Sequence, residues 1–165
     1  RGELEITDAI QELLNNGAKI NTITLDSWWL DTGKKDDLIQ ANKFILDTYI
    51  RHSSLGSIDN KSQIIGQVEV SKGAKVYGSK ILGPVLIGQG TTVVNSTIGP
   101  HTSIGDDCSI HSASISNSVV LKGSSISDEV NIDQSILGRN TLVRGHVETS
   151  RTLKLMLGDD SEVIL

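Results

Sequence analysis

The chain has 165 residues, a formal net charge of −5 and a single cysteine. It contains no apolar run of the roughly 18 residues that a membrane-spanning helix needs, and its acidic balance argues against a nucleic-acid partner, which requires a basic surface. One cysteine excludes an internal disulfide and favours a reducing compartment, so we expect a cytoplasmic protein with neither membrane nor nucleic-acid partners.

The first third of the chain begins with a helical pattern that is followed by an extended one. Thr7 can cap a helix and Gly17 can end it, because a hydroxyl suits the first position and glycine the last. The apolar face of this helix consists of Ile10, Leu13 and Leu14. Residues 18–26 are rich in β-branched side chains and predict a strand, and residues 28–33 predict a turn.

A second helix is predicted from about Lys35 to His52. Apolar residues recur on one face of it at helical spacing, at Leu38, Ala41, Ile45 and Tyr49. Residues 53–57 then link this helix to a segment with a different periodicity.

From Ile64 to Val143 the sequence repeats with a period of seventeen residues, and two steps are shorter by one. Each period divides into three pieces of five or six residues that open on an aliphatic side chain, a spacing that no helix gives. The three columns are Ile64, Ile81, Ile98, Ile115 and Ile132; Val70, Ile87, Ile104, Leu121 and Leu137; and Val76, Val93, Ile110, Ile126 and Val143. We therefore predict coils of three short strands that stack about 4.8 Å apart with the columns pointing inward.

Three six-residue pieces carry a more specific signal, an aliphatic residue followed by glycine and, three positions later, by a small residue. They are residues 87–92, 98–103 and 104–109. This pattern resembles the hexapeptide-repeat family. The resemblance implies a left-handed parallel β-helix, which we expect to span residues 58–150 in about five coils.

The last fifteen residues, 151–165, depart from this period. Leu153, Leu155 and Leu157 alternate with other side chains, and residues 158–161 form a turn sequence before a final apolar stretch. This pattern predicts a β-hairpin that caps the open end of the coils. The predicted fold class is thus mainly β.

Two segments near the start carry a second resemblance. Residues 1–8 read Arg-Gly-Glu-Leu-Glu-Ile-Thr-Asp, and residues 29–33 read Trp-Leu-Asp-Thr-Gly. Together they look like the sugar-binding end of the sugar-1-phosphate nucleotidyltransferase family, in particular of its glucose-1-phosphate thymidylyltransferases. The resemblance covers residues 1–50 and implies that residues 1–33 are an α/β remnant of a nucleotidyltransferase domain and residues 34–57 a linker helix. Because the chain opens on Arg1, we expect it to be the C-terminal fragment of a longer enzyme.

The same resemblance assigns four site residues. It implies that Asp31 is a ligand of Mg²⁺, that Arg1 lies near the phosphates, and that Glu3 and Trp29 line the sugar pocket. A carboxylate oxygen suits Mg²⁺, and a guanidinium suits phosphate. The implied substrates of the complete enzyme are a sugar 1-phosphate and a deoxynucleoside triphosphate. The family's Gly-rich nucleotide loop and its second metal aspartate have no counterpart in this sequence, so we expect the fragment alone to be inactive.

A rival interpretation comes from the repeats, because many hexapeptide-repeat proteins are acyltransferases that use acyl-CoA and a histidine general base. His101 and His111 lie in the coils, but no orienting motif accompanies either of them, and no coil is interrupted by a long loop. We therefore expect exposed corner histidines and an inward-facing, structural Cys108.

The third interpretation is a structural module that needs no catalytic site. Flat solenoid faces commonly pack side by side in this family, which implies a homotrimer or a higher homo-oligomer. Val85, Val94 and Val119 are expected to point outward on one side and to form part of the contact face.

Overall fold

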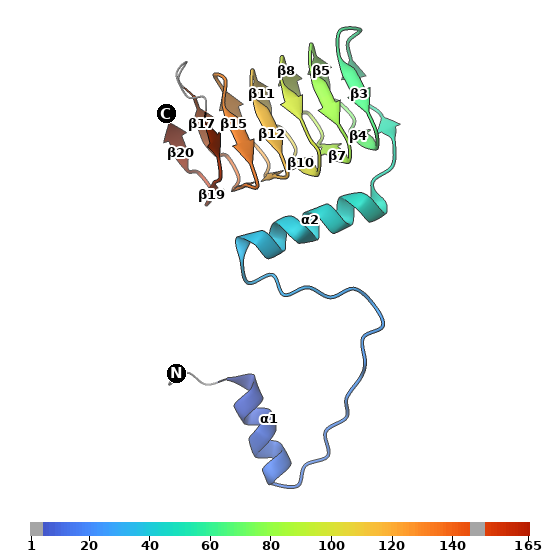
Figure 1. Ribbon diagram of the computed structural model, residues 1–165, viewed down its shortest axis with the longest axis vertical. Helices are drawn as coiled ribbons and strands as arrows, with labels where there is room; N and C mark the ends of the chain where they lie inside the picture. Colours follow the sequence, from blue (N-terminus) through green and yellow to red (C-terminus); the bar gives the residue numbers. More distant parts are fainter. Residues whose placement is uncertain (1–4, 146–150) are drawn as a thin grey trace.

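The computed structural model describes residues 5–145 and 151–165, and a parallel β-helix makes up most of it (Figure 1). Two helices precede the coils, α1 (Ile6–Asn15) and α2 (Lys35–Tyr49). All described strand pairs are parallel, so every strand lies on its equivalent from the preceding coil. Among the described residues no helix is long and apolar enough to cross a membrane.

Three sheets form the sides of the β-helix, and each is named here by its first strand. The β1 sheet consists of β1 (Ser53–Ser54), β4 (Val68–Val70), β7 (Val85–Ile87), β10 (Thr102–Ile104), β13 (Val119–Val120), β16 (Ile136–Leu137) and β19 (Met156–Leu157). The β2 sheet consists of β2 (Ser57–Ile58), β5 (Lys75–Tyr77), β8 (Thr92–Val94), β11 (Ser109–His111), β14 (Ser125–Ser127), β17 (Leu142–Arg144) and β20 (Glu162–Ile164). The β3 sheet consists of β3 (Gln63–Ile65), β6 (Lys80–Leu82), β9 (Thr97–Ile98), β12 (Ser114–Ser116), β15 (Asn131–Asp133) and β18 (Thr152–Leu153).

The predicted aliphatic columns form the core. Ile81 pairs with Ile98 in the β3 sheet, and Val76 pairs with Val93 in the β2 sheet; these four side chains have no exposed surface. One column member was wrong, because Ile104 pairs with Val120 and not with Leu121. Val120 follows Ile115 by five positions, whereas Ile104 follows Ile98 by six, so the corner is one residue shorter than in the preceding coil. Leu121 therefore falls outside the core and is 38% exposed.

The β-helix is longer than the five coils that the sequence predicts, because both ends add strands to it. The sheets contain seven, seven and six strands within the described residues. The predicted C-terminal hairpin is wrong: β18, β19 and β20 each pair in parallel with the preceding coil. Leu153, Leu157 and Val163 continue the three columns. Val143 and Leu153 are ten positions apart, where Ile126 and Ile132 are six apart, and this insertion hid the last repeat.

One corner shows why glycine is required where the coils turn. Gly99 has a φ of +106°, and a Cβ at this position would collide with the carbonyl oxygen of Leu82 in the preceding coil. No side chain fits there, so the glycine permits the close stacking of two coils at this corner.

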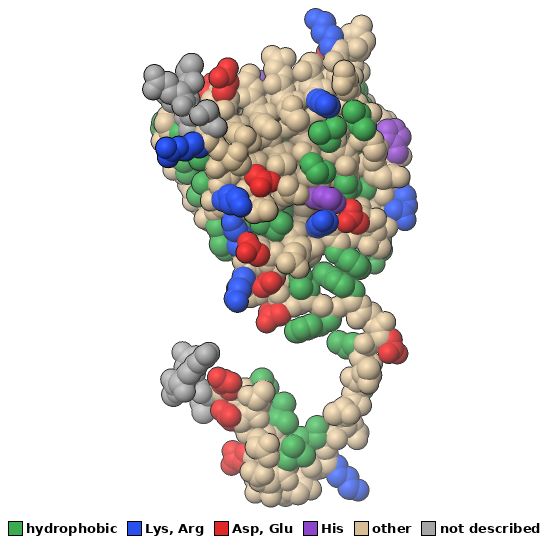
Figure 2. Space-filling view, viewed as in Figure 1, with side chains coloured by type: hydrophobic (Ala, Val, Ile, Leu, Met, Phe, Trp, Pro, Cys, Tyr) green, Lys and Arg blue, Asp and Glu red, His purple; other side chains and the backbone are tan. Residues whose placement is uncertain are grey.

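Residues 5–34 differ from the rest of the described chain, because most of their apolar side chains lie on the surface (Figure 2). Helix α1 forms as predicted, but it begins after Glu5 and not after Thr7, and none of its residues is buried. The predicted strand at residues 18–26 does not form, and this segment pairs with no described strand (Figure 1). A strand needs a partner for its backbone groups, and the described part of the chain supplies none here.

Helix α2 lies along the outer surface of the β-helix, near the β1 sheet (Figure 1). It ends at Tyr49, earlier than the predicted His52. Leu46 within the helix and Ile50 directly after it are the buried positions, at 2% and 9% exposure, so the predicted apolar face is wrong. Of the predicted face, Leu38, Ile45 and Tyr49 are 37%, 46% and 64% exposed, and only Ala41 is half-buried. The helix thus has two apolar stripes, and hydrophobic spacing does not distinguish which one meets the coils.

The expected row of outward valines is also wrong. Val85 is fully buried as an inward residue of β7. Val94 lies on the β2 sheet and Val119 on the β1 sheet, so the two do not share a face. These valines therefore give no support to a single apolar contact face.

Candidate functional site

The turn after the extended segment carries two of the four predicted site residues. The side chain of Asp31 accepts a hydrogen bond from the backbone N–H of Gly33 at 3.2 Å through Oδ1, an arrangement typical of an aspartate turn. Asp31 is exposed, and Trp29 beside it is 70% exposed. Arg1 and Glu3 lie outside the described residues. The structure therefore places Trp29 and Asp31 on one exposed turn, where a partner or ligand can reach both.

Asp31 is chemically suited to the expected metal. The N–H of Gly33 engages only Oδ1, so Oδ2 remains available as a hard oxygen ligand. Mg²⁺ is commonly bound through one or two carboxylates together with waters and substrate phosphates. Among the described residues no group of three or more His, Cys, Asp or Glu side chains could hold a metal ion. Asp31 thus fits as one ligand of a magnesium site, and among the described residues it belongs to no group of three or more such ligands.

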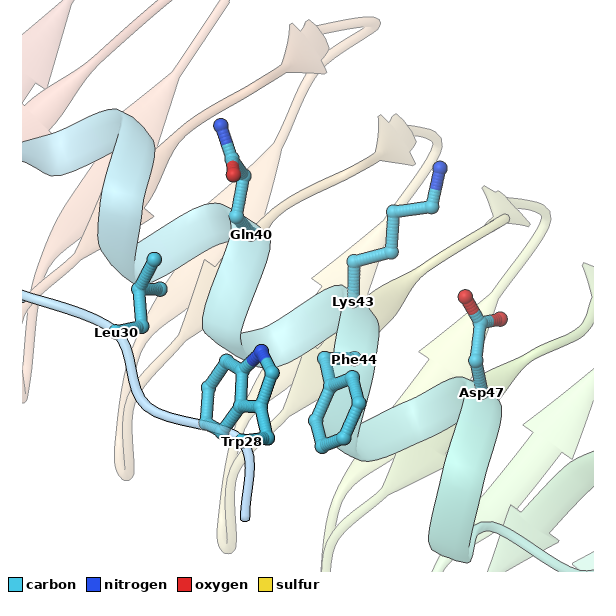
Figure 3. A pocket seen from close by; sticks show the side chains of 6 residues that line it. All are labelled: Trp28, Leu30, Gln40, Lys43, Phe44 and Asp47. Atoms are coloured by element: carbon cyan, nitrogen blue, oxygen red, sulfur yellow. The ribbon is translucent and has the colours of Figure 1, made fainter. Parts of the chain in front are cut away.

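Next to this turn, a pocket of about 410 Å³ opens between the extended segment and α2 (Figure 3). The ring of Trp28 stacks on that of Phe44, with centroids 4.3 Å apart and planes inclined by 5°. Leu30, Gln40, Lys43 and Asp47 complete the lining, and the three polar side chains point away from the two rings (Figure 3).

The tryptophan in the pocket is Trp28, whereas the family resemblance selected Trp29. Side chains alternate along an extended chain, so Trp28 and Leu30 face α2 together while Trp29 points away. That alternation, combined with an aromatic residue on the following helix, is the sequence signal that could have identified Trp28.

The junction between α2 and the β-helix is polar and is centred on His101. Nε2 of His101 lies 2.9 Å from Oδ1 of Asp47, and the side chain of His101 is only 19% exposed. Asn42 donates from Nδ2 to the carbonyl oxygen of His101 at 3.2 Å and accepts from Oγ of Ser103 at 2.6 Å. These three hydrogen bonds, made by Asn42 and Asp47 to His101 and Ser103, are called the α2 anchor below.

The α2 anchor corrects the expectation that His101 is an exposed corner histidine without an orienting partner. Asp47 orients His101, and it lies 54 positions away in the sequence, where no local motif would reveal it. His111 matches the expectation, since it is exposed on β11. Cys108 also matches, because it is 2% exposed and packs in the core.

The pKa values that are clearly shifted belong to groups of the β-helix. Burial raises the pKa of the Cys108 thiol. Burial also acts to raise the pKa of Asp133, but hydrogen bonds from Asn117 and Ser116 outweigh it, so the pKa falls. A hydrogen bond from the hydroxyl of Ser62 lowers the pKa of Asp59, and a hydrogen bond to Asp107 raises that of Lys122. Each cause is a local contact within the coils, so these shifts indicate structural roles and not a catalytic acid or base.

Comparison with known families divides the chain into two matched parts. Residues 1–48 match the nucleotidyl transferase family, and residues 81–163 match the family described as GMPPB C-terminal domain. The first match ends at residue 48, inside α2. Helix α2 therefore matches the nucleotidyl transferase family by sequence, although it packs against the β-helix.

Three curated relatives cover most of the chain. A glucose-1-phosphate thymidylyltransferase of Streptomyces griseus is 40% identical over 161 residues, which is 98% of this chain and 45% of the relative. A protein of the same name from Streptomyces antibioticus is 39% identical over 99% of this chain and 46% of its own. A bifunctional sugar-1-phosphate nucleotidylyltransferase/acetyltransferase of Sulfurisphaera tokodaii is 32% identical over 85% of this chain and 35% of its own. The chain therefore spans less than half the length of these relatives.

Proposed function

The chain belongs to the sugar nucleotidyltransferase superfamily, and from this premise we propose that it is the C-terminal part of an enzyme that makes dTDP-glucose and pyrophosphate from dTTP and glucose 1-phosphate. The observation that supports this reaction best is the 40% identity to a thymidylyltransferase over nearly the whole chain. In the proposed reaction a phosphate oxygen of the sugar attacks the α-phosphorus of dTTP. The bond from that phosphorus to the β-phosphate oxygen breaks, and pyrophosphate leaves.

Catalysis of this kind depends mainly on positioning and on neutralising the phosphate charges. In the proposal Asp31 would hold Mg²⁺, which supplies positive charge to the phosphate oxygens when it is bound. The guanidinium of Arg1 binds a phosphate, since its planar donors match phosphate oxygens. Glu3 accepts hydrogen bonds from sugar hydroxyls, and Trp29 offers an apolar ring face to the sugar. The exposure of Asp31 and Trp29 on one turn supports this assignment.

We propose further that the chain by itself does not catalyse the reaction. Asp31 belongs to no group of three or more potential metal ligands within the described residues, and the sequence has no Gly-rich loop of the kind that cradles a nucleotide in this family. The single Gly-Gln-Gly sequence, at residues 88–90, falls at a corner of the β-helix before β8.

In this proposal the β-helix serves assembly, as a homotrimer or a higher homo-oligomer. Helix α2 covers part of the β1 sheet, which leaves the β2 and β3 sheets as contact faces. Their outward side chains include small polar residues, Thr92 and Ser109 on one face and Thr97 and Ser114 on the other, beside larger ones such as Tyr77. Small side chains leave flat faces, which suit side-by-side packing around a symmetry axis.

The alternative is acyl transfer from acyl-CoA at His101, and it draws on the printed name of the Sulfurisphaera tokodaii relative. His101 has an orienting carboxylate in Asp47, as a general base would need. However, Nε2 of His101 is engaged by that contact to α2, and the described coils contain no extruded loop between β3 and β17. Nucleotidyl transfer therefore remains the preferred proposal.

The test measures pyrophosphate release from dTTP and glucose 1-phosphate with Mg²⁺, in the complete protein and in this chain alone. We expect activity in the first and none in the second. Asp31→Asn in the complete protein should abolish release, whereas Asp26→Asn, five positions earlier in the same exposed segment, should leave it unchanged. Full activity of Asp31→Asn at limiting Mg²⁺ would overturn the metal assignment. Consumption of acetyl-CoA that disappears in His101→Ala would reverse the ranking of the two functions.

A further inference from the structure

We propose that Asn42 and His101 are positioning residues. Through the α2 anchor the β-helix holds α2 in place, and α2 then fixes the position of the turn that carries Asp31. The inference rests on the proposed function in one respect, that Asp31 is a metal ligand. It assigns to the β-helix a direct part in arranging the nucleotidyl-transfer site, and to His101 a role other than that of a general base.

The first step is that α2 is the support of the Asp31 turn. From residue 5 to residue 34 every described residue is exposed except Leu30, which is half-buried. Leu30 and Trp28 line the pocket on α2, and Trp28 stacks on Phe44. Asp31 directly follows Leu30. Within the described residues, the position of the metal-ligand turn is therefore set by contacts to α2.

The second step is that α2 depends on the β-helix. It has fifteen residues, and isolated helices of that length are marginal in water. Its contacts include the buried side chain of Leu46, the α2 anchor, and a hydrogen bond of 3.0 Å from Nζ of Lys35 to the carbonyl oxygen of Gln134. Asn42 and Asp47 lie two residues before and three residues after Phe44. The anchor therefore brackets the residue on which Trp28 stacks.

The third step is that the anchor sits on a rigid part of the β-helix. His101 and Ser103 flank Thr102, which has no exposed surface. Ser103 belongs to β10, which pairs with β7 on one side and β13 on the other. Because this corner cannot shift without disturbing three coils, it is a fixed reference point for α2.

The test uses the fluorescence of Trp28 in the full 165-residue chain, in a Trp29→Phe background that leaves Trp28 as the reporter. The variants are Asn42→Ala, His101→Ala and His101→Gln, whose amide can still donate to Asp47. His111→Ala removes the exposed histidine of β11 and is the matched control. Acrylamide quenching and emission wavelength report on Trp28, and far-ultraviolet circular dichroism confirms that the coils remain folded.

We expect Asn42→Ala and His101→Ala to raise the quenching of Trp28 toward that of free tryptophan and to shift its emission to longer wavelength. His101→Gln should restore most of the parent signal, and His111→Ala should equal the parent. Unchanged quenching in a double variant, Asn42→Ala with His101→Ala, would overturn the inference, whatever the role of Asp31. Retained activity of Asp31→Asn in the complete protein would instead overturn the metal assignment in the proposed function, so the two failures are distinguishable.

Discussion

The hydroxyl of Ser96 accepts a hydrogen bond from the backbone N–H of Ala113, one coil further along, at 3.1 Å. Ser96 in turn donates its own backbone N–H to the hydroxyl of Ser79, at 3.0 Å. All three residues are buried at the corner between the β2 and β3 sheets. At this corner the backbone N–H groups of Ser96 and Ala113 bond to side chains and not to backbone carbonyls. The serine hydroxyl of each coil accepts the hydrogen bond from the next coil, which forms a ladder of hydroxyl contacts along the β-helix.

Ser96→Ala should destabilise the chain by about 1–3 kcal/mol, because it leaves the N–H of Ala113 buried without an acceptor. Urea unfolding followed by circular dichroism measures the change in free energy. Ser114→Ala, an outward hydroxyl one coil away, serves as the control and should change the free energy by less than about 0.5 kcal/mol. Equal effects of both substitutions would contradict the role of this ladder.

A charged substitution at the centre of the isoleucine column should strongly destabilise the chain. Ile98 is fully buried and pairs with Ile81 and Ile115 in the two adjacent coils. Ile98→Asp places an unpaired carboxylate between them and should cost about 4 kcal/mol or more, enough to unfold several coils. Thr97→Asp adds the same charge one position earlier, on the outer face, and should melt close to the parent. A parent-like melting temperature for Ile98→Asp would disprove the register.

The thiol of Cys108 should be unreactive in the native chain. Burial raises its pKa, so the thiolate that attacks a disulfide reagent is scarce, and the sulfur lies 3.2 Å from the carbonyl oxygen of Leu121. Ellman's reagent at pH 8 should label the chain only after denaturation. Rapid labelling of the folded chain would contradict the inward placement of this residue.

The raised pKa of Cys108 also determines how the stability of the chain changes with pH. The pKa of Cys108 is raised in the folded state, so the unfolded chain releases the proton first. The contribution to stability is complete below the unfolded pKa of about 8.5 and is lost as the pH rises through the higher, folded value. Urea unfolding at pH 7 and at pH 10 measures the loss of stability between these two pH values. This loss should be smaller for Cys108→Ala than for the parent chain.

The remaining prediction concerns the oligomeric state of the chain. Light scattering should give three times, or a higher multiple of, the 17.7 kDa of one chain. Ser109→Arg on the β2 sheet and Ser114→Arg on the β3 sheet place a bulky charge on the two candidate faces, and at least one of them should lower the mass. A parent mass near 17.7 kDa would contradict the assembly role.

The seventeen-residue period was sufficient to predict the β-helix and most of its core. Each column residue contacts its equivalent one period away, so the pattern along the chain directly records the contacts in space. The prediction was wrong where the period changes. A corner shorter by one residue moved the column from Leu121 to Val120, and an insertion before Thr152 hid the last coil.

The sequence also carried the family resemblance at Asp31 and Trp29, because those motifs are contiguous. What it did not contain was the relation between α2 and the coils. Apolar residues lie on more than one side of that helix, and the side that packs on the coils depends on which surface lies opposite. Likewise, the pairing of Asp47 with His101 joins residues 54 positions apart, which no local pattern encodes. Only the tertiary structure decided these contacts, because they depend on where the solenoid surface meets the helix.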